Sequence, residues 1–225
     1  MSNRIVVPRR AFLMAGAASV PLLGVMASHL KGSVGVESQA SAAASSVAEA
    51  CHLTEESQYG PFYREGAPWR ATLCDADEPG ERLAITGRVT AAGTCEPLKD
   101  AVLDVWHASA AGFYDNNDPA RPFDPARYHL RGRVRTDAEG RYQFETVLPG
   151  NYGQGRFTRA RHIHLLVTCA GRAPLVTEIY FEGDRHNDTD GLVRRSLITQ
   201  LSGGAPEKGA GPRRGTFDIA LAKAR

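Results

Sequence analysis

The 225-residue sequence predicts an all-β protein: a single β-sandwich domain of mostly antiparallel strands with long functional loops. From Arg82 onward, short apolar or alternating runs are separated by turns rich in glycine, proline and aspartate. The 23 glycines and 13 prolines are also high for a helical protein. The chain shows no internal repeat and no second hydrophobic unit, so one domain accounts for the folded part.

The expected strands are short and follow one another with turn chemistry between them. Residues 83–89 alternate partly with a period of two, which is typical of a half-buried strand. The segment Asp137–Gly140 is a good hairpin loop between two β-rich runs. We expect strands at residues 83–89, 101–106, 132–136, 141–146, 162–168, 175–181 and 217–221.

Two longer stretches, residues 108–127 and 184–214, lack strand periodicity. Loops of that length inside a compact domain are usually functional or mobile.

Residues 1–50 are expected to be a targeting segment and flexible leader. Arg9 and Arg10 come directly before an apolar run that ends at Ala27. This resembles a twin-arginine export signal, and the run is shorter than the roughly 20 residues of a membrane-spanning helix. A buried N-terminal helix is the alternative. We expect export to the periplasm or beyond, no stable membrane span after signal removal, and a β-sandwich domain over residues 51–225.

The charge argues against nucleic-acid binding, and the cysteine spacing argues against a thiolate zinc site. A net charge of +2, with both signs mixed along the chain, argues against a nucleic-acid binder. The chain contains no C-x-x-C pair, which argues against a zinc site built from thiolates. In an oxidising compartment one or two disulfides are expected. Three complete pairings stay open for Cys51, Cys74, Cys95 and Cys169.

The strongest local signal for chemistry is the pair His162 and His164. Residues two apart in a strand point to the same face, so the two imidazoles would project side by side. Such a pair forms half of a metal site, although an H-x-H pattern also occurs on solvent-facing strands.

Two tyrosines in neighbouring loops add to this signal. Tyr114 follows Gly-Phe after an apolar run, and Tyr152 follows Pro-Gly-Asn ten residues before His162. A phenolate is a hard anionic donor that suits a trivalent ion such as Fe(III). Taken singly, each tyrosine is better explained as an ordinary surface or rim residue.

Seven runs, in one order and with similar gaps, resemble the intradiol ring-cleavage dioxygenases, and the protocatechuate 3,4-dioxygenase group in particular. The resemblance extends from about Thr54 to Asp184. The segment that ends at Tyr63 in Gly-Pro-Phe-Tyr also resembles the lead-in to the catalytic domain of that group. The runs are residues 104–108, 112–114, 132–137, 140–144, 149–152, 162–164 and 180–184.

The resemblance implies a site with one non-haem Fe(III) per chain. Tyr114 and His162 match the equatorial ligands of the family, and Tyr152 and His164 match the axial ones. Arg159 stands where the family has an arginine beside the substrate, with Arg156 and Arg161 as rivals.

The resemblance also implies the reaction. A catechol-type aromatic diol would bind as a dianion, and O2 would cleave its ring to a muconate-type diacid. Tyr152 would leave the metal and act as a base, and Arg159 would stabilise developing negative charge. The partners are thus a small aromatic diol and O2, and assembly into a homo-oligomer is left open.

Two rival functions belong to other classes. One is a catalytically silent, exported β-sandwich binding protein on the same scaffold, which would have no reason to keep both tyrosines. The other is a zinc hydrolase that uses the histidine pair, although zinc rarely takes two tyrosinates.

One position departs from the family pattern. The family commonly has Gln where this chain has Glu178. If Glu178 faces the site, it adds negative charge near an anionic substrate or needs Arg159 as a partner. Glu178 is therefore a candidate substrate-binding residue. Tyr63 is a second candidate, at the mouth of the substrate site, with structural packing as the alternative role. The helical linker of the catechol 1,2-dioxygenase branch has no counterpart before Thr54.

Overall fold

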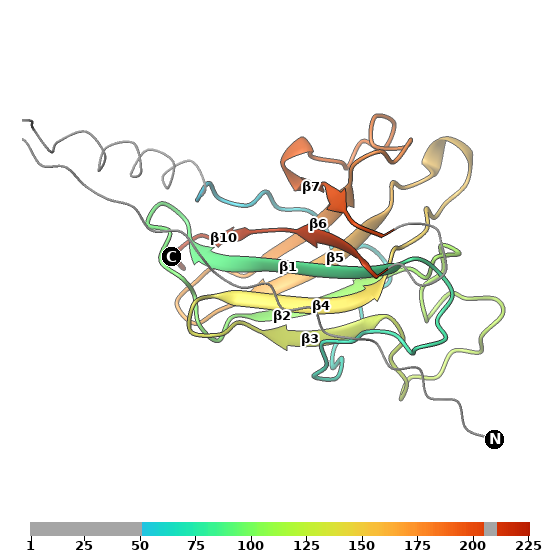
Figure 1. Ribbon diagram of the computed structural model, residues 1–225, viewed down its shortest axis with the longest axis horizontal. Helices are drawn as coiled ribbons and strands as arrows, with labels where there is room; N and C mark the ends of the chain where they lie inside the picture. Colours follow the sequence, from blue (N-terminus) through green and yellow to red (C-terminus); the bar gives the residue numbers. More distant parts are fainter. Residues whose placement is uncertain (1–50, 205–210) are drawn as a thin grey trace, which may run out of the picture. The chain divides into compact units, whose positions relative to one another are not determined.

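The structure is a computed structural model that describes residues 51–204 and 211–225. Within those ranges, regular structure consists of strands and two 3-10 turns, and the strands form two five-stranded sheets packed as a sandwich (Figure 1). The predicted all-β sandwich is confirmed. The predicted leader, residues 1–50, lies outside the described part of the chain, so the boundary at residue 51 stays a prediction.

The first sheet is organised around β1, which spans Arg82–Ala91. Its order is β10-β1-β9-β8, and β4 pairs with β1 in antiparallel register. The strands β9 and β10 pair with β1 in parallel, one after the other. Its other members are β4 (Arg141–Val147), β8 (Leu201–Ser202), β9 (Arg213–Thr216) and β10 (Ile219–Leu221).

The second sheet carries the predicted site. Its order is β3-β2-β5-β6-β7, and only the short pairing of β6 with β7 is parallel. Its members are β2 (Val102–His107), β3 (Arg131–Arg135), β5 (His162–Thr168), β6 (Leu175–Phe181) and β7 (Ile198–Thr199).

The hydrophobic core lies between the two sheets and fixes which way β5 faces. Ile163, Leu165 and Val167 are fully buried members of this core, together with residues of β1 and β4. Because strand side chains alternate, His162 and His164 lie on the opposite face of the same strand. The site is therefore built on the outer face of the second sheet.

The structure corrects the expectation that residues 184–214 lack strands. This stretch contains β7, β8, the start of β9 and a 3-10 turn, Arg195–Leu197. Strands of two residues are too short to show a period, and they form because neighbouring strands offer free backbone groups.

The expected last strand at 217–221 is also corrected. The chain leaves the sheet between β9 and β10, where the amide of Phe217 donates to the carbonyl of Thr86 at 2.9 Å. The carboxylate of Asp218 accepts the amide of Arg88 at 2.8 Å. These two contacts replace regular pairing for two residues, so only Ile219–Leu221 is a strand.

A single disulfide resolves the open cysteine pairing. Cys51 and Cys95 are bonded across a sequence separation of 44 residues, while Cys74 and Cys169 are free. In the part of the chain that the structure describes, no helix is long and apolar enough to cross a membrane.

Candidate metal centre

Three potential ligand atoms converge on the outer face of β5. Nε2 of His162 lies 3.2 Å from Nε2 of His164. The hydroxyl oxygen of Tyr114 lies 3.4 Å from the first nitrogen and 3.2 Å from the second. All three residues are at most 2% exposed. The predicted side-by-side projection of the two imidazoles is therefore present, and a loop far along the chain adds an oxygen to it.

The orientation of His162 is set by its own backbone. Its Nδ1 lies 2.6 Å from the carbonyl oxygen of Ala160, which can only accept a hydrogen bond. Nδ1 is therefore the protonated nitrogen, and Nε2 keeps its lone pair for a ligand.

The loop that carries Tyr114 is held by a buried ion pair next to it. Asp115 accepts two bonds from Arg131, from Nε at 2.8 Å and from Nη2 at 2.6 Å, and one from Arg64 at 2.5 Å. The ring of Phe62 stacks on the ring of Tyr114, with centroids 4.4 Å apart. The phenol thus enters the site from a fixed position.

Trp106 fixes His164 from the side. The two residues lie opposite each other on β2 and β5, and their rings are parallel within 1° with centroids 4.8 Å apart. The backbone of Gly60 also passes so close that a Cβ there would lie 3.3 Å from Cε1 of His164. These contacts leave the His164 ring little freedom to turn.

Tyr152 and Arg159 form the neck of a short loop beside the histidines. The amide of Arg159 donates to the carbonyl of Tyr152 at 2.7 Å. The Tyr152 ring lies 5.6 Å from the ring of Tyr114 and 5.5 Å from that of His162, between centroids. Both residues predicted to take part in catalysis thus lie at the site, with the Tyr152 side chain half-buried.

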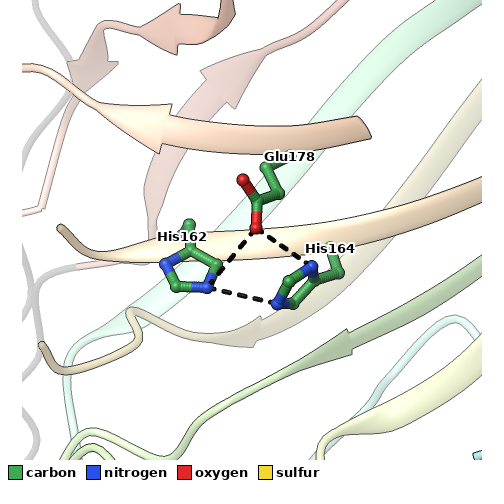
Figure 2. Close-up of side chains that lie close together, drawn as sticks. All are labelled: His162, His164 and Glu178. Atoms are coloured by element: carbon green, nitrogen blue, oxygen red, sulfur yellow. Dashed lines mark hydrogen bonds and ion pairs between the residues drawn. The ribbon is translucent and has the colours of Figure 1, made fainter. Parts of the chain in front are cut away.

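Glu178 lies in the site rather than at its edge. Its carboxylate points between the rings of His162 and His164 (Figure 2), with Oε1 3.8 Å from His162 Nε2 and 3.2 Å from His164 Nδ1. The three residues form a buried group whose ligand atoms lie within 4.8 Å of one another. Arg159 donates to this carboxylate, which is one of the two alternatives that the sequence left open for a Glu178 that faces the site.

Burial controls the protonation of the metal-free site. It raises the pKa of Tyr114 well above its usual value, and Tyr152 and Glu178 raise it further. Burial also lowers the pKa of both His162 and His164. The histidines are therefore neutral near pH 7 and can donate lone pairs, whereas the Tyr114 phenol stays protonated until a cation binds.

The remaining predicted residues lie further out. Tyr63 donates to Asp104 at 3.2 Å and packs on Trp106, so it is not among the converging ligand atoms. Arg161 is 44% exposed and pairs with Asp184 at 3.6 Å. The side chain of Arg156 is outside the described structure. Of the two candidate arginines whose side chains the structure describes, Arg159 is the one that contacts the site.

Sequence reasoning missed three residues that hold Arg159 and Glu178. Asp190 accepts from Arg159 Nε at 2.7 Å, while Tyr180 and Ser57 both donate to Glu178. Tyr180 could have been found, because it follows Glu178 by two residues on one strand. Asp190 and Ser57 lie in irregular segments that offer no periodic signal.

The donor set fits a trivalent iron. Neighbouring ligands around a metal with bonds of about 2.1 Å lie roughly 3.0–3.4 Å apart. The three converging atoms meet that spacing, and a phenol oxygen beside neutral imidazoles suits a hard cation. By contrast, a cavity of about 790 Å3 lined by Trp69, Arg133 and Arg135 contains none of the predicted site residues.

Comparison with known proteins assigns the chain to a family. A family model described as Dioxygenase matches residues 59–222. Chlorocatechol 1,2-dioxygenase of Rhodococcus opacus is 40% identical over 172 residues, which are 66% of this chain and 65% of that protein. The chain belongs to the intradiol ring-cleavage dioxygenase family.

Other members of the family agree with this assignment. The protocatechuate 3,4-dioxygenase beta chain of Burkholderia cepacia is 38% identical over 145 residues, 58% of this chain and 60% of that one. The crystal structure of 3-chlorocatechol 1,2-dioxygenase from Rhodococcus opacus 1CP matches with a TM-score of 0.69 at 28% identity, covering 83% of this chain and 79% of that chain. The chain spans less than two thirds of the length of both curated relatives.

Proposed function

We propose that this chain is a non-haem Fe(III)-dependent intradiol dioxygenase that cleaves a catechol-type ring with O2 to a muconate-type diacid. The observation that carries the proposal is the convergence of Tyr114 Oη, His162 Nε2 and His164 Nε2 within 3.2–3.4 Å. In the overall reaction, the carbon–carbon bond between the two hydroxyl-bearing carbons breaks. Both oxygen atoms of O2 enter the product, which carries two carboxyl groups.

The side chains supply binding, charge and proton transfer. Tyr114, Tyr152, His162 and His164 would hold the iron, which acts as a Lewis acid and template for the diol oxygens. A catechol must lose two protons to bind as a dianion. Tyr152 is placed to accept one of them, because it is only half-buried and stands next to Arg159.

Arg159 supports this proton transfer. Burial raises the pKa of Tyr152, whereas the positive charge of Arg159 lowers it. The guanidinium therefore favours the phenolate form of Tyr152, and it also offers positive charge to an anionic substrate.

Iron content, colour and oxygen uptake test this function. Purified protein loaded with iron should hold about one iron per chain and show a red-brown tyrosinate charge-transfer band. Oxygen uptake should follow with one member of a panel of catechol, protocatechuate, hydroxyquinol and bulkier catechols. Tyr152→Phe should change the spectrum and slow substrate binding. Colourless, iron-free protein would instead support the silent binding protein.

We also propose that the chain is exported by the twin-arginine route. Arg9 and Arg10 before an apolar run support this, as does a disulfide, which persists in oxidising compartments. Replacing both arginines by lysine should keep the protein in the cytoplasmic fraction. Unchanged fractionation would contradict the proposed route.

A further inference from the structure

Glu178 is a buried carboxylate whose two oxygens have different surroundings. Its side chain is 0% exposed. Oε2 accepts hydrogen bonds from Tyr180 at 2.5 Å, from Ser57 at 2.6 Å and from Arg159 at 3.2 Å. A buried charge is tolerated when it is paired and hydrogen-bonded in this way. These donors hold the carboxylate in one orientation in the site.

The other oxygen faces the histidines. Oε1 has one weak donor, Arg159 at 3.3 Å, and lies 3.2 Å from Nδ1 of His164. That nitrogen is buried and has no hydrogen bond of good geometry, although the backbone of Gln58 also contacts His164. This separation is at the long limit for an N–H···O hydrogen bond, so the contact between the carboxylate and the imidazole is mainly electrostatic.

The geometry shows which part of the site Glu178 contacts: the outer nitrogen of a predicted metal ligand. A histidine binds a metal through one nitrogen, and Nε2 of His164 is the atom that meets Tyr114 and His162. Its Nδ1 therefore points away from the centre, and Glu178 meets it there. The carboxylate contacts the outer nitrogen of a ligand, which is the arrangement of carboxylate–histidine–metal triads.

Glu178 also restrains the arginine of the site. Arg159 is held by Glu178 through Nη2 and by Asp190 through Nε, so its guanidinium lies between two carboxylates. The orientation of Arg159 therefore depends on both acidic residues.

We propose that Glu178 is a positioning residue of this centre: one anionic side chain sets the donor strength of His164 and the orientation of Arg159. The inference rests on the proposed iron-dependent function. An anionic partner on Nδ1 makes the imidazole a stronger donor, so it stabilises the ferric state and lowers the Lewis acidity of the metal.

The test compares Glu178→Gln with Asp190→Asn. Each variant removes one negative charge from Arg159, but only the first removes the anion beside His164. The amide oxygen that Asp190→Asn introduces can still accept the amide of Ala160, which Asp190 holds at 2.9 Å. Iron affinity is measured by chelator competition, the charge-transfer band by visible spectroscopy, and kcat and KM with a substrate found active.

Glu178→Gln should weaken iron binding by roughly 10- to 100-fold and move the charge-transfer band to lower energy. Asp190→Asn should leave iron affinity and band position near wild type and change only the kinetic constants. Equal iron affinity and equal bands in the two variants would overturn the inference.

Two further measurements keep the outcomes distinct. If Glu178→Gln does not fold, Glu178→Asp retracts the carboxylate from His164 but keeps the charge, and it should also lose iron affinity. A Glu178→Asp variant with wild-type affinity would contradict the inference.

If the wild-type protein itself binds no iron, the proposed function fails rather than the role of Glu178. The backbone of Gln58, which also raises the pKa of His164, is unchanged in every variant.

Discussion

The amide of Arg159 donates a hydrogen bond to the carbonyl oxygen of Tyr152 at 2.7 Å, so the six residues between them form a closed loop. The residues that form its neck are the two predicted to move protons and stabilise charge. The shape of this short loop therefore controls the placement of both side chains relative to the histidines.

Gly153 should be essential to that loop. Its φ is +102°, and a Cβ there would lie 2.4 Å from the carbonyl oxygen of Phe157. Because neither backbone segment can yield without opening the neck, Gly153→Ala should lower turnover by about 100-fold, the order of loss that a misplacement of about 1 Å produces. Oxygen uptake measures turnover, and iron content shows whether the ligands survive.

Gly155 provides the matched control for this loop. Its φ is +57°, but a Cβ there meets nothing within 4 Å. Gly155→Ala should therefore cost only the backbone strain, about 1–2 kcal/mol, and keep most of the activity. Equal losses of turnover in the two variants would show that the close contact at Gly153 is unimportant.

Trp106 should contribute to both stability and iron binding. Its ring is 1% exposed and lies parallel to that of His164. Trp106→Ala should lower the free energy of unfolding by about 3–5 kcal/mol, since a large buried ring is lost, and should free His164 to turn. Trp106→Phe keeps an aromatic face and also removes an indole N–H that has no hydrogen-bond partner in the described structure. In urea unfolding the Phe variant should therefore have a higher free energy of unfolding than the Ala variant. In iron titration it should also bind iron more tightly.

Much of this architecture could be predicted because it depends on local periodicity. The alternation of His162, Ile163 and His164 was enough to place both imidazoles on one strand face. The contacts of Asp190 and Ser57 could not be predicted, because irregular segments bring them to Arg159 and Glu178 from distant positions. The cysteine pairing could not be predicted for the same reason, because it depends on which distant segments of the chain meet in space.

His107 should make the stability of the metal-free protein depend on pH. It is fully buried between the carbonyl of Ala108 and the hydroxyl of Thr146, and burial lowers its pKa from 6.5 to about 4. Since the unfolded chain binds this proton more readily, the contribution is fully present above about pH 6.5 and is lost as the pH falls toward 4. The loss is roughly 3 kcal/mol over that range.

Urea unfolding at several pH values checks this linkage. His107→Gln cannot titrate, so its free energy of unfolding should fall less steeply between pH 6.5 and 4 than that of wild type. His52→Gln provides the matched control, because it removes an exposed histidine by the same substitution. A His107→Gln slope as steep as that of wild type would assign the acid sensitivity to other groups, such as the two buried histidines of β5.

The Cys51–Cys95 disulfide should stabilise the whole domain by anchoring its first described residues to the turn after β1. Closing a loop of 44 residues restricts the unfolded chain and contributes about 4 kcal/mol on the entropic estimate. Reduction by dithiothreitol, or the double variant Cys51→Ser/Cys95→Ser, should therefore lower the free energy of unfolding by a similar amount and lower Tm with it.

Cys169→Ser is the control, because that thiol is free and half-buried. Because neither cysteine is among the residues that contact His162 or His164, the visible spectrum of iron-loaded protein should not change below the new Tm. A spectrum that changes on reduction would mean that the anchored segment also positions the residues covering His164.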